Sequence, residues 1–277
     1  PPDPCDRESA YYCIAVVADP ARPQGRTLVL DRLRHAYVDL SDPRHLEFGY
    51  VRRFADAAAA VLERTGGKAD VLHFGGGGFS FPRYLLAIAP ATRHTVLEID
   101  PVVLATAREE LGLTESDALR VTTGDARLSI RELPDAGFDL VVGDAFGGLS
   151  VPWHLTTREF LAEVDRVLRP AGRYTMNLID GPQLLFVRAE VATLRERFEH
   201  VAVIAPPAAL RGEAGGNVVV VASHAPIDVA ELDARAASWG DSPATELIAD
   251  AAGLDRFTAG AQPLTDDAAP VDQLIGR

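Results

Sequence analysis

The sequence has few of the features that mark secreted, metal-binding or membrane proteins. Only two of its 277 residues are cysteines, Cys5 and Cys13, too few for a disulfide framework and without the spacing of metal ligands. We therefore expect two free thiols. No apolar run is long enough to span a bilayer, and the chain does not open with a basic segment followed by an apolar one. These absences predict a cytoplasmic protein with no membrane partner.

Positive charge is also scarce. The chain has 40 acidic and 27 basic residues, a formal net charge of −13. Because a nucleic-acid-binding face needs a surplus of basic side chains, this balance argues against a nucleic-acid partner. It favours small-molecule chemistry on a cationic or neutral substrate. The 47% hydrophobic and 24% charged content is ordinary for a globular protein, and the length allows one large domain and a small one.

The chain is organised around residues 71–79, an apolar run ending in Gly75, Gly76, Gly77 and Gly78. The apolar run predicts a buried strand, and helical spacing after Pro82 predicts a helix. Glycine lets the backbone turn tightly and approach a ligand closely. The glycines therefore predict a strand-to-helix turn of the nucleotide-binding type. The alternative is a turn selected only for close packing of the helix on the sheet.

A second apolar run, residues 95–100, contains Glu98 and ends at Asp100. It lies about 20 residues beyond the glycines, the distance at which dinucleotide-binding folds place a ribose-binding acid. In such a sheet this strand ends beside the glycine turn, so Glu98 is the candidate to accept hydrogen bonds from the ribose hydroxyls, with Asp100 beside it. The combination predicts a nucleoside-type ligand.

Strand and helix patterns alternate through most of the chain, which predicts a mostly parallel α/β sheet covered on both faces. Before it, β-rich runs at 12–17, 26–30 and 36–40 predict a small antiparallel sheet. We divide the chain into an N-terminal β domain at 1–42, a nucleoside-binding Rossmann-like domain at 43–223, and a helical, acidic tail at 224–277. The tail should hold surface helices at 227–239 and 243–252. The N-terminal strands offer a surface for a homodimer.

Several acids fall where an open parallel sheet binds ligands, at the carboxyl ends of its strands. They are Glu98, Asp100, Asp125, Asp144 and Asp180. Asp125, followed by Ala126, could accept a hydrogen bond from the exocyclic amine of adenine or cap a helix, and the two roles are compatible. Asp144 could hold or deprotonate a nucleophile, or only cap a loop.

Three larger side chains could line the same cleft. Trp153 and His154 share one loop and could close over a substrate, although a lone histidine is more often a packed or exposed residue. Tyr50 is a further candidate, although it also falls on the core face of a predicted helix. No catalytic serine or cysteine motif is present, and no cluster has metal-ligand spacing, so no metal is predicted.

Taken together, these motifs resemble the spermidine synthase family, the polyamine aminopropyltransferases built on the class I S-adenosylmethionine-dependent methyltransferase fold. The resemblance runs from about residue 8 to about residue 222, and the acidic tail at 264–272 also looks like the ends of bacterial members. It is carried by the glycine turn, residues 97–100, Gly124-Asp125, Gly143-Asp144, and residues 155–160 and 168–172. It implies a mostly parallel Rossmann-like sheet of the seven-stranded type after a small N-terminal β domain.

The resemblance also implies residue roles. Glu98 falls on the family's ribose-binding acid, Asp125 on its adenine-side acid and Asp144 on its amine-activating aspartate. Two departures stand out, because Gly78 and Gly147 occupy positions where the family has aspartates. In the family the first aspartate would hold the amine of the aminopropyl group, and the second would help to hold the polyamine.

These departures bear on the donor. Decarboxylated S-adenosylmethionine ends in a bare ammonium that needs a carboxylate, whereas intact S-adenosylmethionine carries its own carboxylate, which an aspartate at 78 would repel. We therefore expect alkyl transfer from a sulfonium nucleoside to a small-molecule acceptor, with methyl transfer from S-adenosylmethionine leading. Aminopropyl transfer from the decarboxylated donor to a polyamine is the alternative. A non-catalytic nucleoside-binding subunit is a third hypothesis, motivated by the two missing acids.

Overall fold

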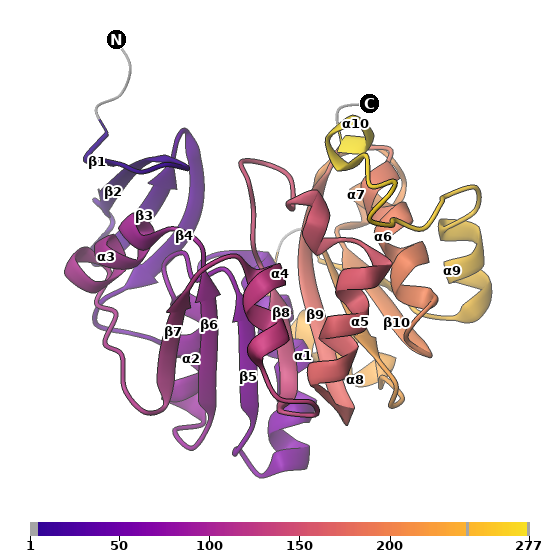
Figure 1. The fold of residues 1–277 in the computed structure, drawn as a ribbon, viewed down its shortest axis with the longest axis horizontal. Helices are drawn as coiled ribbons and strands as arrows, with labels where there is room; N and C mark the ends of the chain where they lie inside the picture. The colour runs from indigo at the N-terminus through magenta and orange to yellow at the C-terminus, as the bar shows by residue number, and fades with distance from the viewer. Residues whose placement is uncertain (1–4, 242–243, 276–277) are drawn as a thin grey trace.

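The computed structural model describes residues 5–241 and 244–275, and its main element is an eight-stranded mixed sheet (Figure 1). The strand order is β12-β10-β11-β9-β8-β5-β6-β7. Neighbours from β7 to β9 are parallel, whereas β11 runs antiparallel to both β9 and β10. The bounds are β5 Asp70–Phe74, β6 Arg93–Glu98, β7 Leu119–Thr123, β8 Phe138–Gly143, β9 Leu168–Asp180, β10 His200–Ala205, β11 Gly216–Ser223 and β12 Glu246–Ile248. The predicted α/β class with a mostly parallel main sheet is confirmed.

Helices cover both faces of this sheet and bury its apolar side chains. One face packs α1 (Gly49–Thr65), α2 (Ser80–Ile88) and α8 (Val229–Ser238) in a single core cluster. The other packs α4 (Ala126–Ser129), α5 (Arg158–Val167), α6 (Leu185–Arg195) and α9 (Ala251–Phe257). Shorter elements are α7 (Pro207–Leu210), α10 (Val271–Ile275), and the 3-10 turns η1 (Ile130–Glu132) and η2 (Trp153–Leu155). The carboxyl ends of the parallel strands stay uncovered by these helices, which leaves that edge for a site.

A second, four-stranded antiparallel sheet is formed by β1 (Arg7–Glu8), β2 (Cys13–Asp19), β3 (Arg22–Leu30) and β4 (Leu33–Asp39). The sequence predicted the three longer strands and missed β1. Figure 1 shows this sheet in indigo, beyond the arrowheads of β5, β6 and β7. Its apolar face shares a core cluster with α3 (Pro101–Glu110) and with Phe79. The small sheet is thereby fixed directly over the glycine turn.

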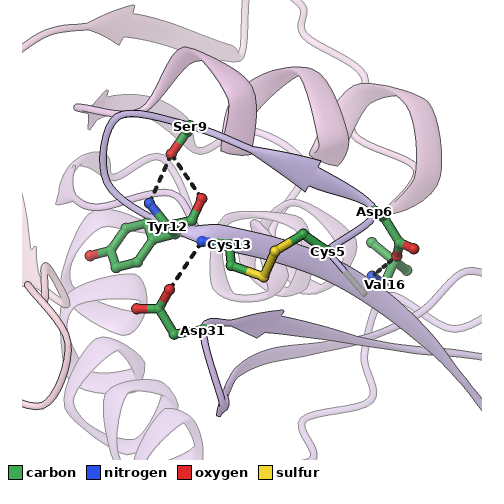
Figure 2. The surroundings of a disulfide bond; sticks show 7 residues. All are labelled: Cys5, Asp6, Ser9, Tyr12, Cys13, Val16 and Asp31. Atoms are coloured by element: carbon green, nitrogen blue, oxygen red, sulfur yellow. Dashed lines mark hydrogen bonds between the residues drawn. A yellow bond between two sulfur atoms is a disulfide. The ribbon is translucent and has the colours of Figure 1, made fainter. Parts of the chain in front are cut away.

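The N-terminal segment corrects the prediction of two free thiols, because Cys5 and Cys13 form a disulfide (Figure 2). The return of β1 along β2 brings the two cysteines together, with Glu8 paired to Cys13. The Ser9 hydroxyl accepts the backbone N–H of Tyr12 at 2.9 Å and fixes the turn between the strands. A pair of cysteines eight residues apart carries no recognisable spacing, so only the strand pairing reveals the bond.

The disulfide does not favour the predicted cytoplasmic location, since such bonds persist mainly in oxidising compartments. The compartment therefore stays a prediction. Within residues 5–241 and 244–275, no helix has both the length and the apolar character that a membrane crossing requires.

The tail also departs from prediction. A helix was expected over 243–252, but β12 occupies 246–248 and extends the main sheet along the edge of β10. Helix α9 begins only at Ala251, where the Asp250 carboxylate accepts the Gly253 N–H at 2.8 Å. Pairing with an open strand edge overrides the local helical pattern here. Residue 243 itself lies outside the described part of the chain.

Candidate active site

The glycine turn after β5 fits tightly against its protein neighbours. Gly75 adopts φ +85°, and a Cβ there would lie 2.5 Å from the backbone oxygen of Asp144. A Cβ at Gly76 would lie 2.4 Å from the ring of Phe79. Close packing, the alternative that the sequence left open, is therefore one reason for these glycines. It is not the whole reason, because Gly75 and Gly77 also line open space.

Gly78 is constrained by the small sheet. A Cβ at this position would lie 2.7 Å from the Cβ of Ala36 on β4 and 3.4 Å from Cγ1 of Val38. The aspartate that the family carries here would therefore require β4 to move. Gly147 differs, since a Cβ there would meet only Pro152, at 3.9 Å. The loss of the first acid is built into the packing of the two sheets, whereas the loss of the second is not.

Glu98 points toward the glycine turn from the end of β6. Its Oε2 accepts the backbone N–H of Gly76 at 2.7 Å and of Gly77 at 3.3 Å, and its Oε1 accepts the N–H of Asp100 at 2.8 Å. The side chain is only 6% exposed, and burial raises its pKa against the opposing effect of these backbone donors. Glu98 thus lies in the predicted place, with its position set by three backbone N–H groups.

Two cavities meet beside the turn. The larger has a volume of about 590 Å³ and the smaller about 100 Å³. The residues that line both are His35, Gly75, Gly77, Asp144 and Phe146. Glu98 lines only the smaller cavity, and Tyr50 lines only the larger. The arrangement offers two compartments that join at Asp144.

Asp144 is the group best placed for chemistry. It follows β8, and its backbone N–H donates to the Phe74 carbonyl at 3.0 Å, which fixes its position beside β5. Its carboxylate accepts the Tyr50 hydroxyl at 3.2 Å and the Asn177 amide at 3.3 Å. Burial raises the pKa of Asp144 to about 7, and these two hydrogen bonds oppose the rise. A carboxylate with this pKa can exchange a proton near neutral pH.

Asp125, Ala126 and His154 line the smaller cavity together. Asp125 caps α4 by accepting the N–H groups of Arg127 and Leu128 through Oδ1. Its other oxygen lies 3.1 Å from Nε2 of His154. The capping role and a position beside the cavity therefore coexist, as the sequence allowed.

The smaller cavity is partly closed by the N-terminal segment. Tyr12, which precedes the disulfide-bonded Cys13, lines the cavity, and its hydroxyl donates to the carbonyl of Phe146 across the opening. Ser9 donates to the buried Asp100 carboxylate at 2.5 Å. At about 100 Å³ the compartment is smaller than usual ligand sites, so a nucleoside would have to displace the contact between Tyr12 and Phe146.

Three predicted residues lie outside both cavities. Asp100 is fully buried and caps α3 by accepting the N–H groups of Val102 and Val103. Asp180 accepts the N–H of Val187, at the start of α6. Trp153 is 51% exposed and faces the segment at 267–273 instead. The structure gives Asp100 and Asp180 capping roles and places Trp153 away from the cleft.

Sequence reasoning missed Asn177 and Tyr12. Asn177 lies in the apolar run of β9, where a polar side chain among buried neighbours is itself a signal of a specific partner. Tyr12 gave no such signal, because only the packing of the small sheet on the main sheet brings it to the cavity.

Comparisons with known proteins agree with this geometry. Residues 72–176 match a family model described as a methyltransferase domain. A polyamine aminopropyltransferase from Vibrio vulnificus is 37% identical over 164 residues, 58% of this chain and 52% of that protein. One from Chromobacterium violaceum is 30% identical over 186 residues, 67% of each. The chain thus spans about half the length of the Vibrio relative.

Among solved structures, a probable spermidine synthase from Corynebacterium glutamicum superimposes with a TM-score of 0.87 at 28% identity. The match covers 96% of this chain and 97% of that one, so it includes both sheets. The chain therefore belongs to the spermidine synthase-like family of polyamine aminopropyltransferases, on a class I methyltransferase fold.

Proposed function

We propose that this chain transfers an aminopropyl group from decarboxylated S-adenosylmethionine to a small amine. The observation that carries the proposal is the position of Asp144, half-buried where the two cavities meet, with a pKa of about 7. Family membership favours aminopropyl transfer over the methyl transfer that the sequence analysis put first.

With the contact between Tyr12 and Phe146 displaced, the smaller cavity would suit the nucleoside part of such a donor. Gly75 and Gly77 present backbone rather than side chains, and Glu98 offers a buried carboxylate for ribose hydroxyls. Asp125 and His154 border the position expected for the base, beside Ala126. Glu98 and Asp125 thus lie at the two ends of the compartment, with the backbone of the glycine turn between them. This arrangement supports an adenosyl group as the ligand.

Asp144 would hold the acceptor amine and take its proton. Tyr50 and Asn177 both donate to its carboxylate, which keeps the oxygens oriented toward the cavities. The donor supplies a carbon bonded to a positive sulfur, so the amine lone pair forms a C–N bond while the C–S electron pair leaves with sulfur as a thioether. The surplus proton of the amine passes to Asp144 or to water. Holding both reactants in one cleft should supply most of the rate.

Methyl transfer from intact S-adenosylmethionine is a second candidate, which Gly78 specifically favours. With Ala36 occupying the space beside it, the turn has no aspartate for the ammonium of the decarboxylated donor. Asp144 would then have to serve the amines of both donor and acceptor. The intact donor carries its own carboxylate and avoids this requirement.

A comparison of donors tests the two candidates. Purified protein is given an amine with either donor, and the released thioether is measured as methylthioadenosine or S-adenosylhomocysteine. We expect methylthioadenosine release with the decarboxylated donor to exceed the other rate by at least about tenfold. The reverse ratio would establish methyl transfer, and tight binding of both donors without any turnover would support a binding subunit.

A designed variant sharpens the comparison. Ala36→Gly combined with Gly78→Asp makes room for the missing acid, and Ala36→Gly alone is its matched control. The added carboxylate should raise the preference for the decarboxylated donor several-fold relative to the control. An unchanged preference would show that this position does not contact the variable end of the donor.

A further inference from the structure

The walls of the larger cavity carry equal numbers of acids and arginines. The acids are Glu47, Asp144 and Asp241, and the arginines are Arg34, Arg52 and Arg53. Long polyamines carry several ammonium groups, each of which must replace its lost water with a carboxylate or another acceptor. The capacity of this cavity for ammonium groups therefore depends on how many of its acids are free.

Asp241 is not free. Its carboxylate pairs with Arg52 through one oxygen and with Nη2 of Arg53 at 3.1 Å through the other. Arg53 is only 2% exposed and also approaches Asp56 at 3.0 Å, so the pair is part of a buried network. An ammonium arriving at Asp241 would meet two guanidinium groups that already neutralise it.

Glu47 is also engaged, at the rim of the cavity. Its carboxylate lies 3.1 Å from Nε2 of His45 and 3.9 Å from Arg34. Arg34 itself lies over the ring of Phe48 and is more than half exposed, so it adds positive charge to this side of the opening. Glu47 is itself 39% exposed, so water screens its attraction for a second cation, and the rim favours such a cation only weakly.

Of the three acids in the wall of the larger cavity, Asp144 is the one that remains available to an ammonium. Its partners are a hydroxyl and an amide, and within residues 5–241 and 244–275 no arginine, lysine or histidine forms an ion pair with it. The wall beyond it includes the apolar side chains of Ile179, Ile204 and Val219.

From this distribution of charge, and resting on the proposed function, we infer that the acceptor carries one ammonium, held at Asp144, and no second cationic group. The acceptor is thus a monoamine with an apolar or anionic remainder, in contrast to a diamine or polyamine. The arginines act as specificity determinants. They exclude a distal ammonium because like charges that face each other at a binding surface are costly.

Three acceptors of matched length test the inference. Butylamine, 4-aminobutanoate and putrescine each have a four-carbon chain with an amine at one end. The other end is a methyl group, a carboxylate and a second ammonium, respectively. Calorimetric binding is measured on protein saturated with methylthioadenosine, which needs no turnover. We expect butylamine or 4-aminobutanoate to bind at least about tenfold more tightly than putrescine. Tighter binding of putrescine than of both monoamines would overturn the inference.

The same amines are then used in turnover with the preferred donor. A matching order of kcat/KM would extend the inference to the reaction. Amine binding in the expected order without thioether release would contradict the proposed function and leave the inference about the cavity intact. Amine binding that does not change when Asp144 is replaced by Asn would contradict the inference, since the ammonium would then be held elsewhere.

A variant should relax the selectivity. Arg52→Gln removes one of the two cations on Asp241 and should improve putrescine binding relative to butylamine about threefold or more. Arg64→Gln is the control, because Arg64 lies on the same helix, outside the cavity. An equal ratio of putrescine affinity to butylamine affinity in both variants would show that Arg52 does not determine the selectivity between the two amines.

Discussion

The two cavities that meet at Asp144 are built in different ways. The smaller is bordered by backbone and by the residues that end successive parallel strands, such as Gly75, Glu98 and Asp125. The larger is bordered by side chains from β4, α1, β9 and β11, and by Asp241 and Thr245. The position of the first compartment follows from the topology of the sheet, so the residues that border it should tolerate little displacement. The second depends on side-chain identity, so its specificity can change without a change of fold.

The largest effect is expected where the compartments join. Asp144→Asn keeps the shape of the side chain and removes the base, so kcat should fall by about 10² to 10⁴ while methylthioadenosine affinity stays within about threefold. The variant should therefore lose kcat in rate measurements and keep its methylthioadenosine affinity in calorimetry. A parallel loss of nucleoside affinity would mean that Asp144 acts in nucleoside binding, and an unchanged kcat would show that it takes no part in the chemistry.

The pH dependence provides the next largest effect. Because burial raises the pKa of Asp144 to about 7, the carboxylate is ionised and able to accept a proton above that pH and is lost as a base below it. The value of kcat/KM should therefore fall about tenfold per unit as the pH drops below about 7. A flat profile from pH 5 to 8 would contradict the assignment.

Tyr50, a hydrogen-bond partner of Asp144, provides a test of whether the pH dependence comes from Asp144. The Tyr50 hydroxyl lowers the pKa of Asp144 by hydrogen bonding to its ionised form, so Tyr50→Phe should shift the acid limb to higher pH. Tyr84→Phe is the control, since Tyr84 lines neither cavity. The ionisation of the acceptor amine is common to both variants and cancels in the comparison.

The same contrast explains what could be predicted. Glycines, an acid at the end of β6 and an acid after β8 are local signals, so the sequence identifies residues that line the smaller cavity and places Asp144 at the cleft. The neutralisation of Asp241 by Arg52 depends on residues 189 positions apart, which no local pattern reports. The obstruction of Gly78 by Ala36 depends likewise on how two sheets pack. Trp153 was misplaced for the same reason, since the path of its loop is set by contacts with the tail.

A third test addresses the smaller compartment alone. Glu98→Gln removes the charge that would accept hydrogen bonds from ribose hydroxyls and should weaken nucleoside binding by about ten- to hundredfold. Amine binding in the larger cavity should be unchanged. Asp117→Asn, at an exposed position, controls for the loss of one negative charge. Equal losses for nucleoside and amine would show that the compartments are one site, provided that thermal unfolding confirms an intact fold.

The smallest effect concerns the segment that closes the nucleoside compartment. Reduction of the Cys5–Cys13 disulfide releases the constraint on the turn that holds Ser9 and Tyr12, so the contacts with Asp100 and Phe146 should open more often. Because a nucleoside has to displace the contact between Tyr12 and Phe146, nucleoside affinity should rise about threefold, roughly 0.7 kcal/mol, while amine affinity is unaffected. Dithiothreitol titration with calorimetry measures this. The Cys5→Ser, Cys13→Ser variant should show the higher affinity before any reductant is added and no response to it. An equal change in both cavities would mean that the disulfide stabilises the whole fold and not this wall. A response of the variant to dithiothreitol would show that the effect does not come from the disulfide.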